Sequence, residues 1–145
     1  MRVQGSFTFD AGIEKVWTSM LSSEVLASCI PGCDEIRSTG ENSYEIDLTV
    51  RVASVRGEYK GEVRLEDIDE FKSYRMVVTG SGRGGSVQGS GDLSFSEADG
   101  KTTVDVTGDT QVTGVVARVG QRLLGGASRM MMRQFFDCLR TKIEE

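Results

Sequence analysis

The chain has 145 residues, of which 38% are hydrophobic and 27% charged, and its formal net charge is -5. This size and composition are typical of one folded domain with its own core, and they exclude a disordered chain. The acidic balance argues against nucleic-acid binding through bulk electrostatics. The chain has no histidine, which excludes a Ser-His-Asp triad, a Cys-His pair and an imidazole metal site. We therefore expect neither a catalytic residue nor a metal ligand.

The cellular location is predicted from the absence of export signals. Residues 1–10 alternate between apolar and polar side chains, so we expect no secretory signal. No apolar run approaches the roughly 20 residues that span a bilayer. With three cysteines, one must stay unpaired, and we expect structural or incidental roles for all three in a reducing cytoplasm. Cys138 is interpreted as a small apolar core residue.

The predicted elements follow from hydrophobic periodicity in chain order. Alternation predicts a strand over 2–9. Helical spacing then predicts a helix over about 13–21 and a shorter one that ends at Pro31. From 33 to 112 the pattern has period two and predicts six strands separated by turn clusters. Residues 114–143 are predicted to form one long amphipathic helix.

This element order predicts an α+β domain over 1–145. Strands joined by short turns pair mainly antiparallel, and the long helix is the element able to cover their apolar faces. We predict a curved antiparallel sheet around the C-terminal helix, with two short helices after the first strand. Glycines in the inward rows indicate either a bend with close packing or missing side-chain volume, hence a cavity. They stand at positions 57, 61, 80, 82, 89, 91 and 108.

A glycine-rich stretch matches a nucleotide-binding motif in its residue types but not in its predicted structural context. Residues 80–85, Gly-Ser-Gly-Arg-Gly-Gly, match the dinucleotide fingerprint. That motif needs a following helix whose N-terminus binds the pyrophosphate, and here another alternating strand follows. We therefore do not expect a nucleotide site.

The predicted C-terminal helix has two unlike faces. One broad apolar face is expected to pack against the sheet, and a narrow basic stripe lies opposite. Arginines around exposed apolar side chains suit phospholipid headgroups or an acidic protein partner, although such a stripe is also common on a merely solvated helix. The docking residues predicted on this basis are Arg118, Arg122, Arg129, Arg133, Phe136 and Arg140.

Three stretches of the sequence resemble the carbon monoxide dehydrogenase G-subunit family. They are residues 30–33 (Ile-Pro-Gly-Cys), 55–63 and 119–136, and the last is the most specific. This family belongs to the START-like (SRPBCC), helix-grip superfamily, which includes polyketide cyclases and plant pathogenesis-related proteins. The resemblance covers essentially the whole chain. It implies a seven-stranded antiparallel sheet that grips the C-terminal helix over an apolar cavity.

The resemblance also implies partners. Members associate with a molybdenum-containing carbon monoxide dehydrogenase or a related hydroxylase and are not themselves the catalyst. They link that enzyme to the cytoplasmic face of the membrane, with a bound quinone as electron acceptor. Many carry a variable tail beyond the helix that helps attachment. This sequence ends at Glu145, so we expect either that such a tail is missing from it or that its peripheral contact with the membrane is transient.

We therefore expect a non-enzymatic protein that binds menaquinone, ubiquinone or another lipid, with no covalent cofactor. Each buried methylene contributes ~0.8 kcal/mol, and one or two polar contacts select the ligand. Tyr44, Tyr59 and Gln134 are the candidate polar contacts. The residues predicted from their inward phase to line the cavity are Trp17, Leu21, Ile30, Tyr44, Ile46, Tyr59, Met76, Val78, Val87, Val104, Val116, Val119, Leu123, Ala127, Met131 and Gln134.

Two other functions stay open. An enzyme of cyclase or isomerase type needs an inward acid or base, and the acids Asp47, Glu58, Glu62 and Asp92 fall on the outward phase of their strands. A register error of one residue would reverse that assignment. An adaptor or assembly factor without a ligand would instead have a filled core.

Overall fold

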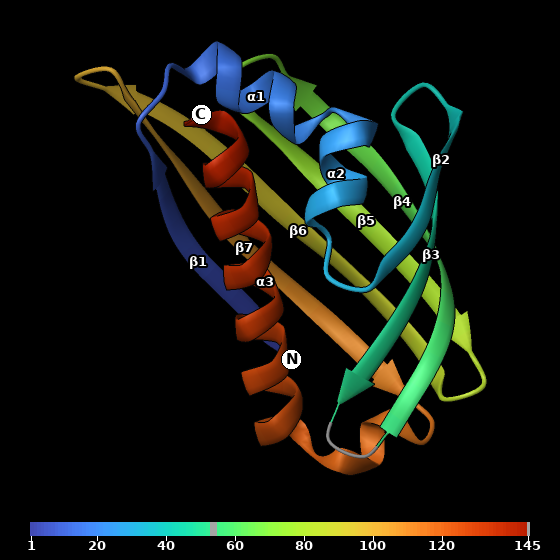
Figure 1. Cartoon of the computed structure of the whole chain (residues 1–145). Helices are drawn as coiled ribbons and strands as arrows, with labels where there is room; N and C mark the ends of the chain where they lie inside the picture. The colour runs from blue at the N-terminus through green and yellow to red at the C-terminus, as the bar shows by residue number, and fades with distance from the viewer. Residues whose placement is uncertain (53–54, 145) are drawn as a thin grey trace.

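A seven-stranded antiparallel sheet curves around the C-terminal helix, as predicted (Figure 1). The computed structural model describes residues 1–52 and 55–144. Neighbouring strands follow the order β1-β7-β6-β5-β4-β3-β2. The elements in chain order are β1 (Arg2–Phe9), α1 (Ile13–Met20), α2 (Ser23–Cys29), β2 (Cys33–Gly40), β3 (Ser43–Val52), β4 (Val55–Asp69), β5 (Ser73–Gly82), β6 (Gly85–Ala98), β7 (Lys101–Thr113), the 3₁₀ turn η1 (Val116–Val119) and α3 (Gln121–Ile143).

The long helix starts later than predicted. Gly114 and Gly120 have φ angles of 88° and 94°, and a right-handed helix cannot continue through a residue with positive φ. The two glycines therefore separate η1 from β7 on one side and from α3 on the other. The prediction of one helix over 114–143 was wrong at this end, and Arg118 lies outside α3.

Aromatic side chains fill the end of the fold beneath α1. The indole of Trp17 meets Phe71, Tyr74 and Phe95 edge-on, with ring centroids 6.0, 5.5 and 4.9 Å away. Such edge-to-face pairs add roughly 0.5–1.5 kcal/mol each beyond their buried area. Val104 of β7 is fully buried in the same cluster. This end of the space between sheet and helices is therefore solid core.

A second packed contact joins α3 to β1. The ring of Phe136 stacks on Phe7 at 3.9 Å with 11° between the planes, and Phe136 is only 3% exposed. The prediction of Phe136 as an outward docking residue was wrong, because α3 also packs against β1 and buries this face. Arg140 is likewise engaged within the fold: its guanidinium lies 5.5 Å from the Phe9 ring centroid, and its Nε donates to the Thr8 carbonyl at 3.2 Å.

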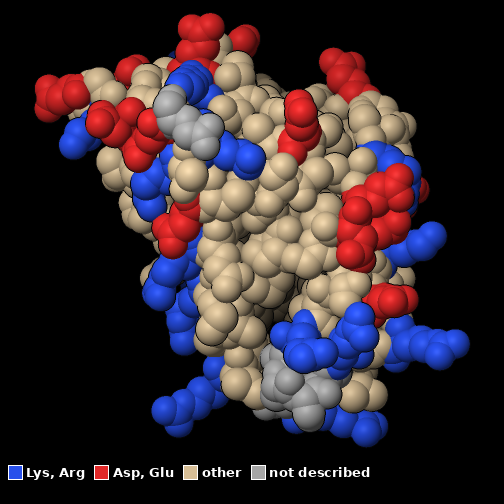
Figure 2. All heavy atoms as spheres, viewed as in Figure 1, with Lys and Arg blue, Asp and Glu red and all other residues tan. Residues whose placement is uncertain are grey.

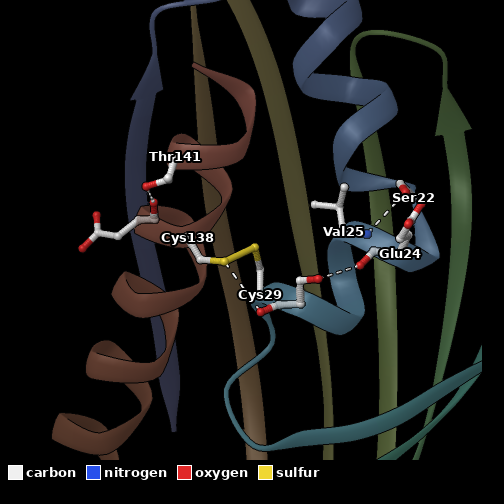
Figure 3. Close-up of a disulfide and its surroundings, with 8 residues drawn as sticks. Ser22, Glu24, Val25, Cys29, Cys138 and Thr141 are labelled. Atoms are coloured by element: carbon white, nitrogen blue, oxygen red, sulfur yellow. Dashed lines mark hydrogen bonds between the residues drawn. A yellow bond between two sulfur atoms is a disulfide. The ribbon is translucent and has the colours of Figure 1, made fainter. Parts of the chain in front are cut away.

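A disulfide joins α2 to α3 (Figure 3). It links Cys29, the last residue of α2, to Cys138, with 5.4 Å between their Cα atoms. The interpretation of Cys138 as a small apolar core residue missed this bond, because the sequence alone does not place residues 109 positions apart side by side. Cys33 carries a free thiol, as the odd number of cysteines required.

Replacing both Cys29 and Cys138 by alanine is expected to lower the free energy of unfolding by about 2–4 kcal/mol, because the bond closes a long loop in the unfolded chain. Urea denaturation with and without dithiothreitol measures the effect, and Cys33→Ala serves as the matched control. If reductant leaves the midpoint of the parent chain unchanged, the disulfide does not contribute to stability.

Candidate functional site

A cavity of about 250 Å³ lies between the sheet and the N-terminal half of α3. Its wall is almost entirely carbon, contributed by β3 to β7 and by the inward side of α3. The lining residues are Met1, Leu48, Val50, Gly57, Tyr59, Gly61, Val78, Thr79, Gly80, Val87, Thr110, Val112, Leu124, Ala127, Ser128 and Met131.

Glycines account for part of the empty space. Gly61 and Gly80 pair across β4 and β5 in the floor of the cavity. A Cβ added at either position would come no nearer than 3.5 or 3.6 Å to backbone atoms. Side chains would fit there, so their absence leaves volume unfilled. At Gly108 and Gly89, by contrast, a Cβ would lie 2.7 Å from the neighbouring strand. The sheet thus uses glycine both for close approach of strands and for open space.

An open groove of about 580 Å³ adjoins the cavity. It runs between β3 and α3 and includes Pro31 and Gly32 after α2. Val50, Ala127 and Met131 line both the groove and the cavity. The hollow between sheet and helix therefore leads outward past these three side chains.

The structure divides the predicted lining residues by their position along the strands. Tyr59, Val78, Val87, Ala127 and Met131 lie in the cavity wall. Leu123 and Gln134 line the outer groove together with Ala127 and Met131.

The remaining predicted residues whose side chains the structure describes lie elsewhere, and their prediction as cavity lining is corrected. The alternation of residues identifies which side chains of a strand face the helix, but it does not show how far along the strand a cavity extends. The side chains packed in the core beneath α1 and α2 are Trp17, Leu21, Tyr44, Met76 and Val104. Ile46 is buried in β3 and Ile30 is half-buried after α2. The side chains of Val116 and Val119 lie outside the described residues.

Sequence reasoning did not single out Leu48, Val50, Val112 or Leu124, which also line the cavity. The first three share the inward alternation of the predicted strands. In the sheet register Val50 of β3 pairs with Gly57 of β4, and Val112 of β7 pairs with Val87, whose partner on β5 is Gly80. Proximity to glycine in a neighbouring strand is therefore the signal that could have located the open end.

The rotation of α3 also differs from the predicted phase. Leu123 and Met130, expected to face inward, are 46% and 58% exposed. Leu124 of the same predicted face is buried as expected, and Leu139, which was not assigned to that face, is buried too. Because Phe136 packs on β1, α3 is turned so that the edge of its apolar face remains uncovered beside the groove. The result is an exposed apolar strip at the rim.

The three candidate polar contacts lie in different surroundings. The Tyr44 hydroxyl donates to the carbonyl oxygen of Leu21 at 3.4 Å, outside the cavity wall. Gln134 is exposed in the groove. The Tyr59 hydroxyl is buried, and among the described residues it has no hydrogen-bond partner.

The acidic residues of the sheet point away from the cavity, as the alternation predicted. Asp47 accepts from Arg37 at 3.0 Å, and this hydrogen bond lowers the pKa of the Asp47 carboxyl. Asp92 accepts from Arg75 at 3.1 Å. Glu58 and Glu62 are exposed. The described part of the cavity wall therefore contains no carboxylate.

Basic side chains gather at the end of the molecule where α3 begins, whereas acidic side chains are seen mainly toward the end where α1 lies and on the side of β2 (Figure 2). Arg51 at the end of β3, Arg56 at the start of β4 and Arg122 at the start of α3 are all exposed. Arg129 and Arg133 continue the exposed series along α3. The groove thus lies at the basic end of an acidic chain.

Two further features of the described residues bear on the site. No helix in the described part of the chain combines the length and the apolar character that a bilayer span requires. Within residues 1–52 and 55–144, the Cys, Asp and Glu side chains do not form a group of three or more that could hold a metal ion.

Comparison with known proteins gives one family and a set of similar structures. The sequence profile of the carbon monoxide dehydrogenase G-subunit family (CoxG) matches residues 5–144. No curated protein matches the chain. A crystal structure of a conserved protein from Geobacillus kaustophilus is 30% identical, with 99% of this chain and 95% of that chain covered and a TM-score of 0.95.

More distant structures share the fold. The Zhui aromatase/cyclase from Streptomyces sp. R1128 is 15% identical, with 99% of this chain and 93% of that chain covered and a TM-score of 0.74. A START superfamily protein from Mycobacterium smegmatis is 11% identical, with 99% and 97% covered and a TM-score of 0.72. At these identities the likeness concerns the fold alone.

Proposed function

Because the chain belongs to the carbon monoxide dehydrogenase G-subunit family, we propose that it is a non-catalytic accessory protein that binds an apolar ligand between the sheet and α3. The observation that carries this proposal is the carbon-lined cavity at the open end of the grip. Its partner is a molybdenum carbon monoxide dehydrogenase or a related hydroxylase, and its ligand is a respiratory quinone.

The size of the hollow supports a ligand with a compact ring and a long tail. Ligand sites for small molecules usually enclose about 300–1,000 Å³. The cavity alone, at about 250 Å³, suits a ring, and the adjoining groove of about 580 Å³ offers space for a prenyl chain. Each methylene that leaves water there contributes ~0.8 kcal/mol.

The cyclase or isomerase alternative finds no carboxylate, lysine or cysteine in the described wall. General acid or base chemistry needs an ionisable group within hydrogen-bond reach of the substrate. The nearby carboxylates of Asp47 and Glu58 lie on the other face of the sheet. The filled-core adaptor is likewise not favoured, because the space between β5 and α3 is open.

Native mass spectrometry followed by lipid extraction tests the proposal on protein purified without detergent. We expect a prenylquinone in one-to-one ratio with the chain. Protein that stays empty in the presence of excess menaquinone and ubiquinone would contradict quinone binding. Turnover of a small polar substrate would instead support an enzyme.

We further propose that the protein works at the inner face of the cell membrane, with the groove turned toward the lipid. The exposed apolar side chains of Leu123 and Met130 stand beside Arg122, Arg129 and Arg133 on α3. Apolar residues flanked by arginine suit the boundary between anionic headgroups and acyl chains. Contact at this end would bring the groove next to membrane quinone.

The triple change of Arg122, Arg129 and Arg133 to glutamate is expected to weaken binding to vesicles with anionic lipid by at least about tenfold, because each basic residue near such a surface contributes about 1 kcal/mol. Vesicle sedimentation measures the effect. The matched control reverses Lys15, Lys72 and Lys101, which are exposed on other parts of the chain and give the same change in net charge. Equal loss in both variants would mean that only net charge matters, and would remove the α3 surface from the proposal.

A further inference from the structure

The Tyr59 side chain lies flat on the concave face of the sheet. A Cβ added at Gly57, two residues earlier on β4, would lie 2.6 Å from Tyr59 Cε2 and 2.9 Å from its hydroxyl oxygen. A Cβ at Gly82, its partner on β5, would lie 3.1 Å from Cδ1. The ring thus occupies space that Gly57 leaves free, whereas a Cβ at Gly82 would first meet the carbonyl oxygen of Glu58. Its hydroxyl is thereby held over Gly57, and both Gly57 and Tyr59 belong to the wall of the cavity.

The hydroxyl is buried at that position without a partner among the described residues. A buried hydroxyl that makes no hydrogen bond has lost its contacts with water and gained none in return, so such groups are rare in folded proteins. The Tyr44 hydroxyl, by comparison, donates to the Leu21 carbonyl oxygen. Tyr59 is therefore a polar group placed where the ligand-free chain makes no use of it.

We propose that the Tyr59 hydroxyl donates a hydrogen bond to a neutral oxygen atom, a carbonyl or a hydroxyl, on the head group of the bound ligand. This inference rests on the proposed function, because it assigns an orientation and a chemical class to the ligand of the same cavity. It makes Tyr59 a residue that selects an oxygenated ring over a plain hydrocarbon.

The charge of the wall favours a neutral head group. A carboxylate or phosphate buried there would lose its hydration, and that cost is large unless a cation pairs with it. The described wall contains no lysine or arginine. The ammonium of Met1 borders the wall but already donates to the Thr110 carbonyl at 2.7 Å. Anionic heads are therefore disfavoured inside the cavity.

The position of Tyr59 also orients the tail. With the head group beside Gly57, whose partner on β3 is Val50, the tail leaves past Val50, Ala127 and Met131, which line both hollows. It then follows the groove toward Leu123. The ligand is thus held head inward, with its chain directed to the exposed rim of α3.

The test compares two ring-matched probes, 2-methyl-1,4-naphthoquinone and 2-methylnaphthalene, by isothermal titration calorimetry. Tyr59→Phe is expected to weaken binding of the quinone by about 3- to 10-fold, the effect of one neutral hydrogen bond, and to leave the hydrocarbon within about twofold. Tyr44→Phe is the matched control and leaves both affinities unchanged. The denaturation midpoint of ligand-free Tyr59→Phe is expected to equal or exceed that of the parent.

The outcomes separate this inference from the proposed function. If Tyr59→Phe binds the quinone as tightly as the parent does, the hydroxyl is not its anchor, although the cavity still binds. If the parent binds neither probe, the ligand-binding function itself fails.

The orientation of the ligand is tested separately, by comparing a quinone that has a tail with one that has none. Leu123→Ser is expected to weaken binding of the same quinone bearing an isoprenoid tail by about threefold or more, since less apolar surface is covered, and to leave the tail-less quinone unchanged. A reversed result, with only the tail-less quinone affected, would overturn the head-inward orientation.

Discussion

Tryptophan in place of Val78 is expected to abolish quinone binding, whereas tryptophan in place of its neighbour Val77 leaves binding intact. Val78 lines the cavity, so an indole there takes the space that the ligand needs. Val77 points to the opposite face of β5, between Arg64 and Ser90 on the neighbouring strands. We expect at least a 100-fold loss for Val78→Trp, equivalent to about 2.8 kcal/mol, measured by calorimetric titration.

Val77→Trp controls for the effect of tryptophan on strand stability, because both variants replace a valine of β5 by the same aromatic residue. Gly80→Val offers a second way to fill the space, because a Cβ there would approach backbone atoms no closer than 3.6 Å. If folded Val78→Trp and Gly80→Val both bind the quinone like the parent chain, the ligand does not occupy this cavity.

Replacing Phe136 by alanine is expected to lower the free energy of unfolding by about 3–5 kcal/mol. The ring is 3% exposed and lies in a stack with Phe7 at 3.9 Å, so truncation removes buried area and leaves a void between α3 and β1. Urea denaturation followed by circular dichroism measures the change.

Met130→Ala is the matched control on the same helix. Its side chain is 58% exposed, and changes at such positions usually stay within about 0.5 kcal/mol. A loss of less than about 1 kcal/mol for Phe136→Ala would contradict the packing of α3 on β1. It would also restore Phe136 as an outward residue of the arginine stripe.

The strand alternation and the helix spacing predicted the element order because both patterns are local and regular. Tyr74 and Val78 of β5 share one face in the sequence pattern and in the structure. The pattern does not distinguish them further. Tyr74 lies beneath α1, where aromatic rings fill the space. Val78 lies beside Gly80 at the cavity, where the space is open. Whether an inward residue is core or cavity depends on packing between elements distant in sequence.

The prediction of which side of α3 faces the sheet was partly wrong, and the reason is again packing between elements distant in the sequence. The apolar face predicted for α3 is broader than the surface that the sheet covers, so the sequence alone does not determine which edge is left exposed. The stack of Phe136 on Phe7 determines it, and Leu123 is exposed as a consequence. The disulfide between Cys29 and Cys138, like the Phe136–Phe7 stack, joins residues that are distant in the sequence, so no local pattern predicts it.

The unused hydroxyl of Tyr59 was partly foreseeable. Its inward phase and its phenol made it a candidate polar contact, as for Tyr44. Only the structure separates the two, because Tyr44 donates to a backbone carbonyl and Tyr59 does not have a described partner. A polar residue within a run of inward glycines is the sequence feature that sets Tyr59 apart.

A crystal structure of the chain grown with 2-methyl-1,4-naphthoquinone tests the binding site most directly. We expect electron density for the ring between Val78 of β5 and Met131 of α3, both of which line the cavity. Side chains that close this space and leave the quinone unbound or bound elsewhere would contradict the account.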